Sequence, residues 1–424
     1  MDLETDSDQI AIPAVYMRGG SSKAIFFHAR DIPPAGKKRD RLLKRIIGAP
    51  DPLQIDGMGG AKAITSKMAI ISESRRDMTD VDYEFVQVGV ADDEVKYNMA
   101  CGNISAAVGP FAVDEGLIKT FREGKGPPTP SDSTTSQANG LSGLAKTQAE
   151  PRYQEIRIYN TSTEKNFIAH IPVNANGKSV SKGKYQIAAV PGSGAPIMLD
   201  YRETLGAALN KGLFPTGNPK DEINMSNGRR VGITISDAGN ICVFALARDL
   251  DITGHESASE LTRTKHLIRA TRELRGRAAQ MVGMCADWNK VDEQSPFLPM
   301  PVLIADPTHR AGSGAHVCGR LFLDNMCHES MAGTGSVSFA AASRVVGSVV
   351  YNLIGADAAK ETTLNIEHPM GIMPIAVEVD MIHEDGGVPR FLTLSFIRTA
   401  RRLMDGSVYV PAEVFEDEEA SVDA

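Results

Sequence analysis

The sequence predicts an α+β protein made of two similar halves, each a β-sheet rolled around one central helix. The main observation is a glycine-containing turn that occurs twice, at residues 99–107 and 331–338. Each copy continues into a segment of small residues, and a helix of such residues has no polar face, so other elements must surround it. Strand-like segments precede and follow both copies, which indicates a duplicated order of elements.

The composition is that of an ordinary globular protein. The chain has 424 residues, enough for two or three domains, with 42% hydrophobic and 23% charged residues. Its net charge of −8 disfavours nucleic acid and membrane surfaces as partners. The acidic first residues lack the features of a secretory or mitochondrial leader, and no run reaches the roughly 20 apolar residues of a membrane span. We therefore expect a cytoplasmic protein, and the sequence allows a homodimer.

Neither a disulfide framework nor a metal centre is expected. The five cysteines are odd in number and irregularly spaced, without a CxxC pair. His309, His316 and His328 lack the spacing of zinc or iron ligands.

The elements of the first half follow from local patterns. Apolar segments flank the turn at residues 18–23, and residues 37–47 have the amphipathic spacing of a helix that ends at Gly48. The Ala-rich segment 101–117 is predicted to be a buried helix with a kink near Pro110. Strands are predicted at 67–72, 83–90, 155–159, 166–171 and 185–190.

The second half is expected to begin after a glycine-rich turn at residues 191–194. We assign residues 1–188 to the N-terminal half and 189–389 to the C-terminal half, with a strand near 390–412 that completes the N-terminal half. Residues 122–150, rich in Pro, Gly, Ser and Thr, are expected to form a mobile surface insertion, and residues 413–424 a disordered acidic tail. Strands are predicted at 230–235, 241–247, 300–304 and 390–399, and helices at 257–281 and 336–350.

Cys101 and Lys67 are the candidate groups for proton transfer. Cys101 lies at the start of a predicted helix, where the dipole and nearby amides would lower the pKa of a thiol, or it is a small hydrophobic residue in a packed core. Lys67 leads into an apolar strand, where burial would lower its pKa and make it a general base, or it extends from the strand end to solvent. In the second copy of the turn, Ala332 stands opposite Cys101.

Two turns are candidate sites for anionic groups. Arg18 and the amides that follow it can clamp a carboxylate, and the same residues also suit a simple tight hairpin. His328, Thr334 and Gly335 belong to the second turn, where His328 either contacts a ligand or orients the turn.

Six segments of the chain together resemble the PrpF-like isomerases, a branch of the diaminopimelate epimerase-like superfamily. They occur in order from about residue 12 to about residue 400, and the 122–150 insertion and the acidic tail lie outside them. The segments are MRGGSSKAIFF, DGMGG…TSKMAII, YNMACGNISAAVGPFAVDEGLI, PGSGAPI, LFPTG and SMAGTGSVSFAAAS.

The resemblance implies two pseudo-symmetric domains with the active site between them and no metal or organic cofactor. The acid and base groups of that family match Lys67 and Cys101. Epimerases of the superfamily place a cysteine in each half, whereas this chain has Ala332 at the second position, which disfavours an epimerase. The substrate-binding residues are expected to be Arg18, Gly19, Gly20, Ser21, Ser22, Thr65, Ser66, Gly102, Asn103, His328, Ala332, Gly333, Thr334 and Gly335.

We therefore expect a cofactor-independent isomerase that moves a double bond by a 1,3-proton shift in an unsaturated tricarboxylate. Conversion of cis-aconitate to trans-aconitate is the leading expectation. The alternatives are a 2-methylaconitate, methylitaconate or oxalomesaconate isomerase, and a non-catalytic accessory protein that binds carboxylates.

Overall fold

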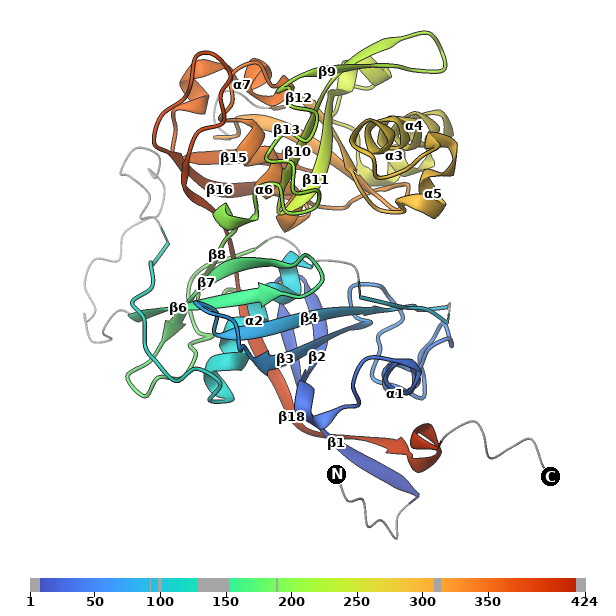
Figure 1. Cartoon of the computed structure of the whole chain (residues 1–424), viewed down its shortest axis with the longest axis vertical. Coiled ribbons are helices and arrows are strands. Elements are labelled where there is room, and N and C mark those ends of the chain that lie inside the picture. The colour runs from blue at the N-terminus through green and yellow to red at the C-terminus, as the bar shows by residue number, and fades with distance from the viewer. Residues whose placement is uncertain are drawn as a thin grey trace, which may run out of the picture.

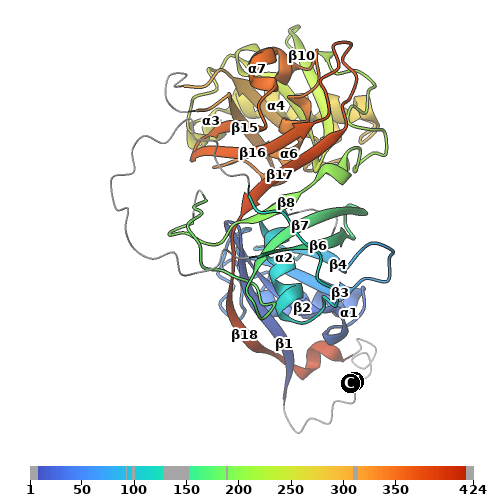
Figure 2. The same ribbon diagram turned by 90° about the vertical axis from the view of Figure 1, so that its left-hand side faces the viewer.

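The computed structural model describes residues 8–91, 93–97, 101–127, 152–187, 190–308 and 314–416. These residues form two bodies that lie end to end along the long axis of the molecule (Figure 1). In the view turned by 90°, β8 and β17 lie where the two bodies meet (Figure 2). None of the helices in the described ranges is long and apolar enough to cross a membrane.

The sheet of the first half is mostly antiparallel, with two parallel pairs. β3 runs parallel to β2, and β6 runs parallel to β4. The strands are β1 (Gln9–Gly19), β2 (Ser22–His28), β3 (Lys67–Glu73), β4 (Val81–Val88), β5 (Val95–Lys96), β6 (Arg152–Asn160), β7 (Lys165–Val173) and β8 (Ile197–Asp200).

The sheet of the second half repeats this pattern. β12 runs parallel to β11, and β15 runs parallel to β13, in the same places of the strand order. The strands are β9 (Asp221–Asn224), β10 (Arg230–Ala238), β11 (Asn240–Leu246), β12 (Met300–Ala305), β13 (Val317–Leu323), β14 (Met326–Cys327), β15 (Thr363–His368), β16 (Gly371–Val379) and β17 (Phe391–Arg398). The duplication predicted from the two turns is therefore present in the strand pairing itself.

β17 connects the two halves into one sheet. β17 pairs with β16 of the second half and with β8 of the first. After Thr399 the chain returns to the first half as β18 (Ala400–Pro411), which pairs with β1 along its whole length. β8 pairs with β7 of the first half and with β17 of the second, so it lies at the boundary between the halves.

Each half surrounds one buried helix, α2 (Gly102–Asp114) in the first and α6 (Gly333–Ala342) in the second. Ile104 and Phe111 of α2 and Val337 and Phe339 of α6 are fully buried in one core cluster. Burying each such side chain contributes about 1.5–3 kcal/mol, so the inner faces of the curved sheets fix both helices in place. Pro110 lies inside α2, as the sequence indicated.

The outer helices match the sequence patterns where one local signal dominates. α1 (Lys37–Ile47) ends at Gly48, which adopts a left-handed conformation. The helix predicted at 257–281 is two helices, α3 (Ala258–Arg263) and α4 (Lys265–Val282), because Thr264 leaves the helical conformation. The helix predicted at 336–350 is also two: α6 ends at Ser343, and Ser348 caps α7 (Val349–Ala359). A short α5 (Val291–Gln294) follows α4. Of the predicted strand at 185–190, the described residues contain only an isolated bridge at Tyr185, and residues 188–189 lie outside the described ranges.

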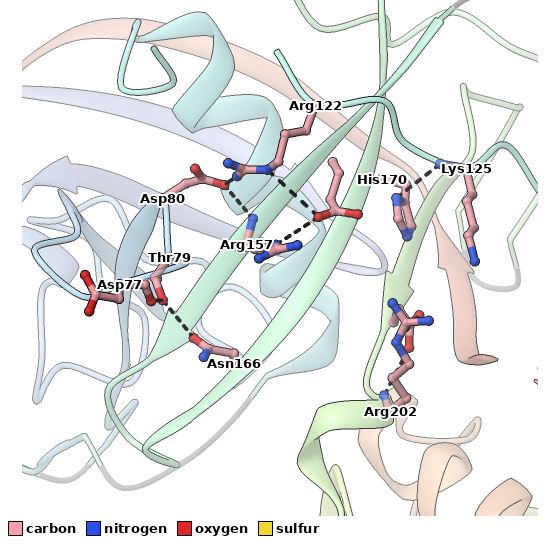
Figure 3. A network of polar contacts seen from close by, with 11 residues as sticks. Asp77, Thr79, Asp80, Arg122, Lys125, Arg157, Asn166, His170 and Arg202 are labelled. Carbon is pink, nitrogen blue, oxygen red and sulfur yellow. Dashed lines mark hydrogen bonds and ion pairs between the residues drawn. The ribbon is translucent and has the colours of Figure 1, made fainter. Parts of the chain in front are cut away.

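The start of the predicted insertion is an ordered part of the first half. Arg122 makes an ion pair with Asp80, whose carboxylate also accepts a hydrogen bond from the backbone N–H of Arg157 at 2.8 Å (Figure 3). The backbone of Glu123 forms a bridge with Gln154 of β6. Residues 128–150 lie outside the described residues. The predicted acidic tail likewise begins in a short helix, Ala412–Phe415, and residues 417–424 lie outside the described ranges.

Candidate active site

The two central helices begin face to face at the junction of the halves. A Cβ atom built on Gly102 would lie 3.5 Å from the backbone nitrogen of Thr334. Cys101 and Ala332 are the N-cap residues, and neither of these two side chains accepts a hydrogen bond from a first-turn amide. Because these amides and both helix dipoles point into one place, the junction suits a negatively charged group.

Each helix start is held by a tight turn of its own sheet. Gly20 has φ +52°, and a Cβ atom on it would lie 2.2 Å from Oδ1 of Asn103, so only glycine fits. In the second half Gly239 has φ +68°, and its Cβ would lie 2.8 Å from the carbonyl oxygen of Thr334. The Asn103 amide donates to Ser21 Oγ at 3.2 Å, and the Asn240 amide donates to Thr334 Oγ1 at 2.8 Å. The turns thus position both helix N-termini in matching ways.

Lys67 is buried in the first half near the start of α2. It is the first residue of β3 and is 8% exposed. Its ammonium group donates to Oε1 of Gln87 and lies 5.0 Å from the centre of the Phe85 ring. Burial lowers the pKa of Lys67 below its usual value, and the nearby Cys101 partly opposes this effect. A buried lysine beside a thiol can exchange protons, and the position excludes the alternative of a lysine that reaches solvent.

Cys101 differs from the other four cysteines of the chain, all of which are buried. Burial raises the pKa of Cys242 and of Cys327 to about 12, which makes both thiols inert. Cys101 is partly exposed, and its position at the open end of α2 brings it into electrostatic contact with Lys67. It is the cysteine suited to chemistry.

A cavity of about 60 Å³ opens beside these helix starts and is lined by both halves. Ser21 and Asn103 line it from the first half, while Ser330 and His368 line it from the second. Burial lowers the pKa of His368 to about 4, with nearby Arg398 contributing, so its imidazole is neutral at pH 7. The cavity therefore combines hydroxyl, amide and neutral imidazole groups, which suit carboxylate oxygens.

Arg398 supplies the positive charge of this cavity, and the sequence analysis did not identify it. Its Nε donates to Asn103 Oδ1 at 3.1 Å, and its Nη1 donates to the carbonyl of Ile397 at 3.0 Å. Burial lowers its pKa to about 10, so the guanidinium stays charged at neutral pH. Its hydrogen-bond partners among the described residues are neutral, which leaves its charge for an anionic ligand.

The predicted substrate-binding residues divide into two groups. Ser21 and Asn103 line the cavity, and Gly102, Ala332, Gly333 and Thr334 form the two helix starts. Gly335 is buried against Leu321 and is the third residue of α6.

The other predicted contacts are engaged within the protein. Arg18 donates through Nη1 to the carbonyls of Gly20 and Thr399, both at 2.8 Å, so it fixes the turn, and its role in binding a carboxylate stays a prediction. The Thr65 and Ser66 hydroxyls donate to the carbonyl of Lys62, each at 3.0 Å.

His328 and the turn that ends in Ser22 are held in the same way. Nδ1 of His328 lies 2.9 Å from the carbonyl oxygen of Ser330, which favours its orienting role. Ser22 is buried, and Gly19 lies against the backbone of Asn103, where its Cβ would be 2.5 Å from the carbonyl oxygen.

Comparison with known proteins gives the same family along nearly the whole chain. The PrpF protein family model matches residues 9–124 and 137–411. The gap in this match covers residues 125–136, so the insertion relative to the family is shorter than the predicted 122–150. A 3-methylitaconate isomerase from Eubacterium barkeri is 36% identical over 413 residues, which cover 95% of this chain and 98% of that protein.

Solved structures confirm the fold that the sequence predicted. A crystal structure of methylitaconate-delta-isomerase has a TM-score of 0.79 at 34% identity and covers 99% of this chain and 100% of that chain. A hydroxyproline epimerase from Agrobacterium vitis, only 10% identical, has a TM-score of 0.51 and covers 95% of this chain and 93% of its own, which shows the epimerase-like fold alone.

Proposed function

The chain belongs to the PrpF family and is an isomerase, and we propose that it moves a double bond by a 1,3-proton shift in an unsaturated tricarboxylate. The leading substrate is cis-aconitate and the product trans-aconitate. The observation that carries this proposal is that a buried lysine and a partly exposed cysteine lie together beside one helix start, while the other helix start has Ala332. In this proposal the first half supplies the groups that transfer protons, and both halves supply groups that bind the substrate.

In this proposal the carboxylates of the substrate bind where positive potential is concentrated. One lies at the facing starts of α2 and α6, and another pairs with Arg398. Ser21 and Asn103 donate to the remaining oxygens. These donors hold the negative charge that spreads over the carboxylates when a proton leaves carbon, and such stabilisation in a site shielded from water lowers the barrier strongly.

The proton shift uses Lys67 and Cys101 at the two ends of the allylic unit. One group takes a proton from the CH₂ carbon, the C–H electron pair forms the new double bond, and the old double bond's electrons move onto the conjugated carboxylate. The other group then donates a proton to the far carbon, which restores neutrality of the carbon skeleton. In aconitate the shift exchanges the CH and CH₂ arms, so the connectivity is unchanged and only the double-bond geometry differs.

Proton NMR of cis-aconitate in D₂O tests this proposal. We expect formation of trans-aconitate with deuterium at the allylic carbon. Lys67→Ala and Cys101→Ala should each lower turnover by orders of magnitude, while Lys62→Ala, a change in the neighbouring exposed loop, should not. Full turnover in either Lys67→Ala or Cys101→Ala would contradict the assignment, and tight binding without exchange would favour the accessory protein.

The identity to 3-methylitaconate isomerase favours a second candidate substrate, a methylated dicarboxylate. Both substrates supply one carboxylate for the helix starts and one for Arg398, so a comparison of rates must decide between them. A panel of aconitate, 2-methylaconitate, methylitaconate and oxalomesaconate, followed by ultraviolet absorbance, would show which substrate gives the highest kcat/KM.

A further inference from the structure

We propose that Gln87 is a positioning residue for Lys67, holding the lysine through an uncharged acceptor that suits both of its protonation states. Gln87 is the register partner of Lys67 across β3 and β4, and its Oε1 accepts from the lysine Nζ. This inference rests on the proposed role of Lys67 in proton transfer. Gln87 itself touches the lysine and not the reacting carbons.

The orientation of the Gln87 amide is fixed by its other end. Its Nε2 donates to the carbonyl oxygens of Ala63 at 3.2 Å, Ser66 at 3.0 Å and Val88 at 3.2 Å. A flipped amide would place its oxygen against these three acceptors, which is unfavourable. The oxygen must therefore face Lys67, and the residue also ties β4 to the loop that leads into β3.

An uncharged partner matters because Lys67 must lose and regain a proton. A carbonyl oxygen accepts a hydrogen bond from either an ammonium or a neutral amine, whereas a carboxylate would stabilise the ammonium strongly. Phe85 faces Lys67 from β4, and Cys101 of α2 is the one titratable group that acts on it electrostatically within the described ranges. Gln87 therefore positions the amine of Lys67 without strongly stabilising its protonated form.

The second half supports a chemical role for this pair. Met300 is the first residue of β12, and Lys67 is the first residue of β3. Leu323 is the last residue of β13, and Gln87 lies one residue before the end of β4. Met300 points toward α6, since a Cβ on Gly335 would lie 3.2 Å from its Cε. The half that has Ala332 in place of cysteine thus also has apolar residues in place of the lysine and its glutamine. A glutamine that served only the fold would be expected in both sheets. Its absence from the half that also lacks the lysine favours a chemical role.

The test is the Gln87→Glu variant, which keeps size and shape and adds a charge. We expect the pKa of Lys67 to rise by about one or more, measured by NMR titration of protein labelled with ¹³Cε-lysine and assigned with Lys67→Ala. With Lys67 as the group that takes the proton from carbon, kcat at pH 7 in the exchange assay should fall about tenfold or more and recover at higher pH, with KM changed little. Gln154→Glu, a charge placed at another buried glutamine of the same half, should leave the titration of Lys67 and the pH profile unchanged.

Two results would overturn the proposal. An unchanged Lys67 titration in Gln87→Glu, with thermal unfolding showing a folded protein, would show that Gln87 does not set the state of the lysine. A fall in kcat of equal size at every pH would indicate a structural role. The titration needs no substrate, so failure of the proposed reaction would not be confused with failure of this inference. Should Gln87→Glu not fold, Gln87→Met provides the second variant, for which a loss of kcat at unchanged KM is expected and full kcat would contradict.

Discussion

Gly102 and Gly333, the first residues of the two central helices, contact the same aromatic ring. A Cβ atom built on Gly102 would lie 3.1 Å from Cζ of Phe396, and one on Gly333 would lie 2.7 Å from it. The Phe396 ring in turn stacks on Tyr201, with centroids 5.4 Å apart. The distance between the two helix starts is therefore set by a ring from β17, the strand that pairs with both halves.

Gly333→Ala is expected to disturb binding at this junction. The added methyl group would overlap Phe396, and relief of such overpacking costs about 1–3 kcal/mol of stability. Separation of the helix starts should raise KM. The melting temperature measures the accompanying loss of stability. Gly232→Ala is the matched control, because its Cβ would meet only the mobile end of Lys220. Unchanged KM in Gly333→Ala would show that the helix starts do not hold the substrate.

Arg398→Gln is expected to weaken substrate binding. Loss of one charge-assisted hydrogen bond costs about 1.5–3 kcal/mol, so KM for the tricarboxylate should rise about 10- to 100-fold. Arg401→Gln, a change at an exposed position on the neighbouring strand, is the control. Equal KM values for Arg398→Gln and wild type would exclude Arg398 from the binding site.

The burial of Lys67 predicts a pH dependence of stability. Its pKa is lower in the folded protein than in the unfolded chain. Between the two pKa values the unfolded chain binds more protons, so stability rises with pH through this window, and a tenfold change in proton affinity corresponds to about 1.4 kcal/mol. Lys67→Met should be more stable than wild type at pH 7, with the difference shrinking as the pH approaches 10.5, the usual pKa of lysine. Urea unfolding from neutral to alkaline pH measures this, and Lys62→Met should show no such trend.

Cys101 should be the one thiol that reacts readily in the folded protein. Because the other four cysteines are buried, iodoacetamide should add one carbamidomethyl group and abolish turnover. Mass spectrometry of the intact protein counts the groups, and bound tricarboxylate should slow the reaction. In Cys101→Ala the native protein should remain unmodified. Rapid labelling of that variant would show that another thiol is accessible.

Local patterns predicted those features that depend on neighbours in sequence. The helix at 37–47 and its end at Gly48 follow from amphipathic spacing and a glycine, and the structure has the same limits. Thr264 was not predicted to break a helix, because its neighbours on both sides favour the helical state.

The residues of the candidate site also divide into those that local sequence could predict and those that it could not. Lys67, Cys101 and Asn103 could be found because each lies in a recognisable local motif. Arg398 and Gln87 could not, since neither lies in a recognisable local motif and each acquires its partner through long-range pairing. Arg18 was predicted to bind a carboxylate, and its hydrogen bond to the carbonyl of Thr399 could not be predicted because Thr399 is distant in sequence.

The return of β18 to β1 has a consequence for how the protein is made. A ribosome releases β1 before every other strand and β18 after them, so one edge of β1 stays without its partner until almost the whole chain has emerged. The second half, by contrast, draws its strands from one continuous stretch, β9 to β17. The half that carries Lys67 and Cys101 is thus the last to be completed, and every nascent chain stopped before residue 400 lacks part of it.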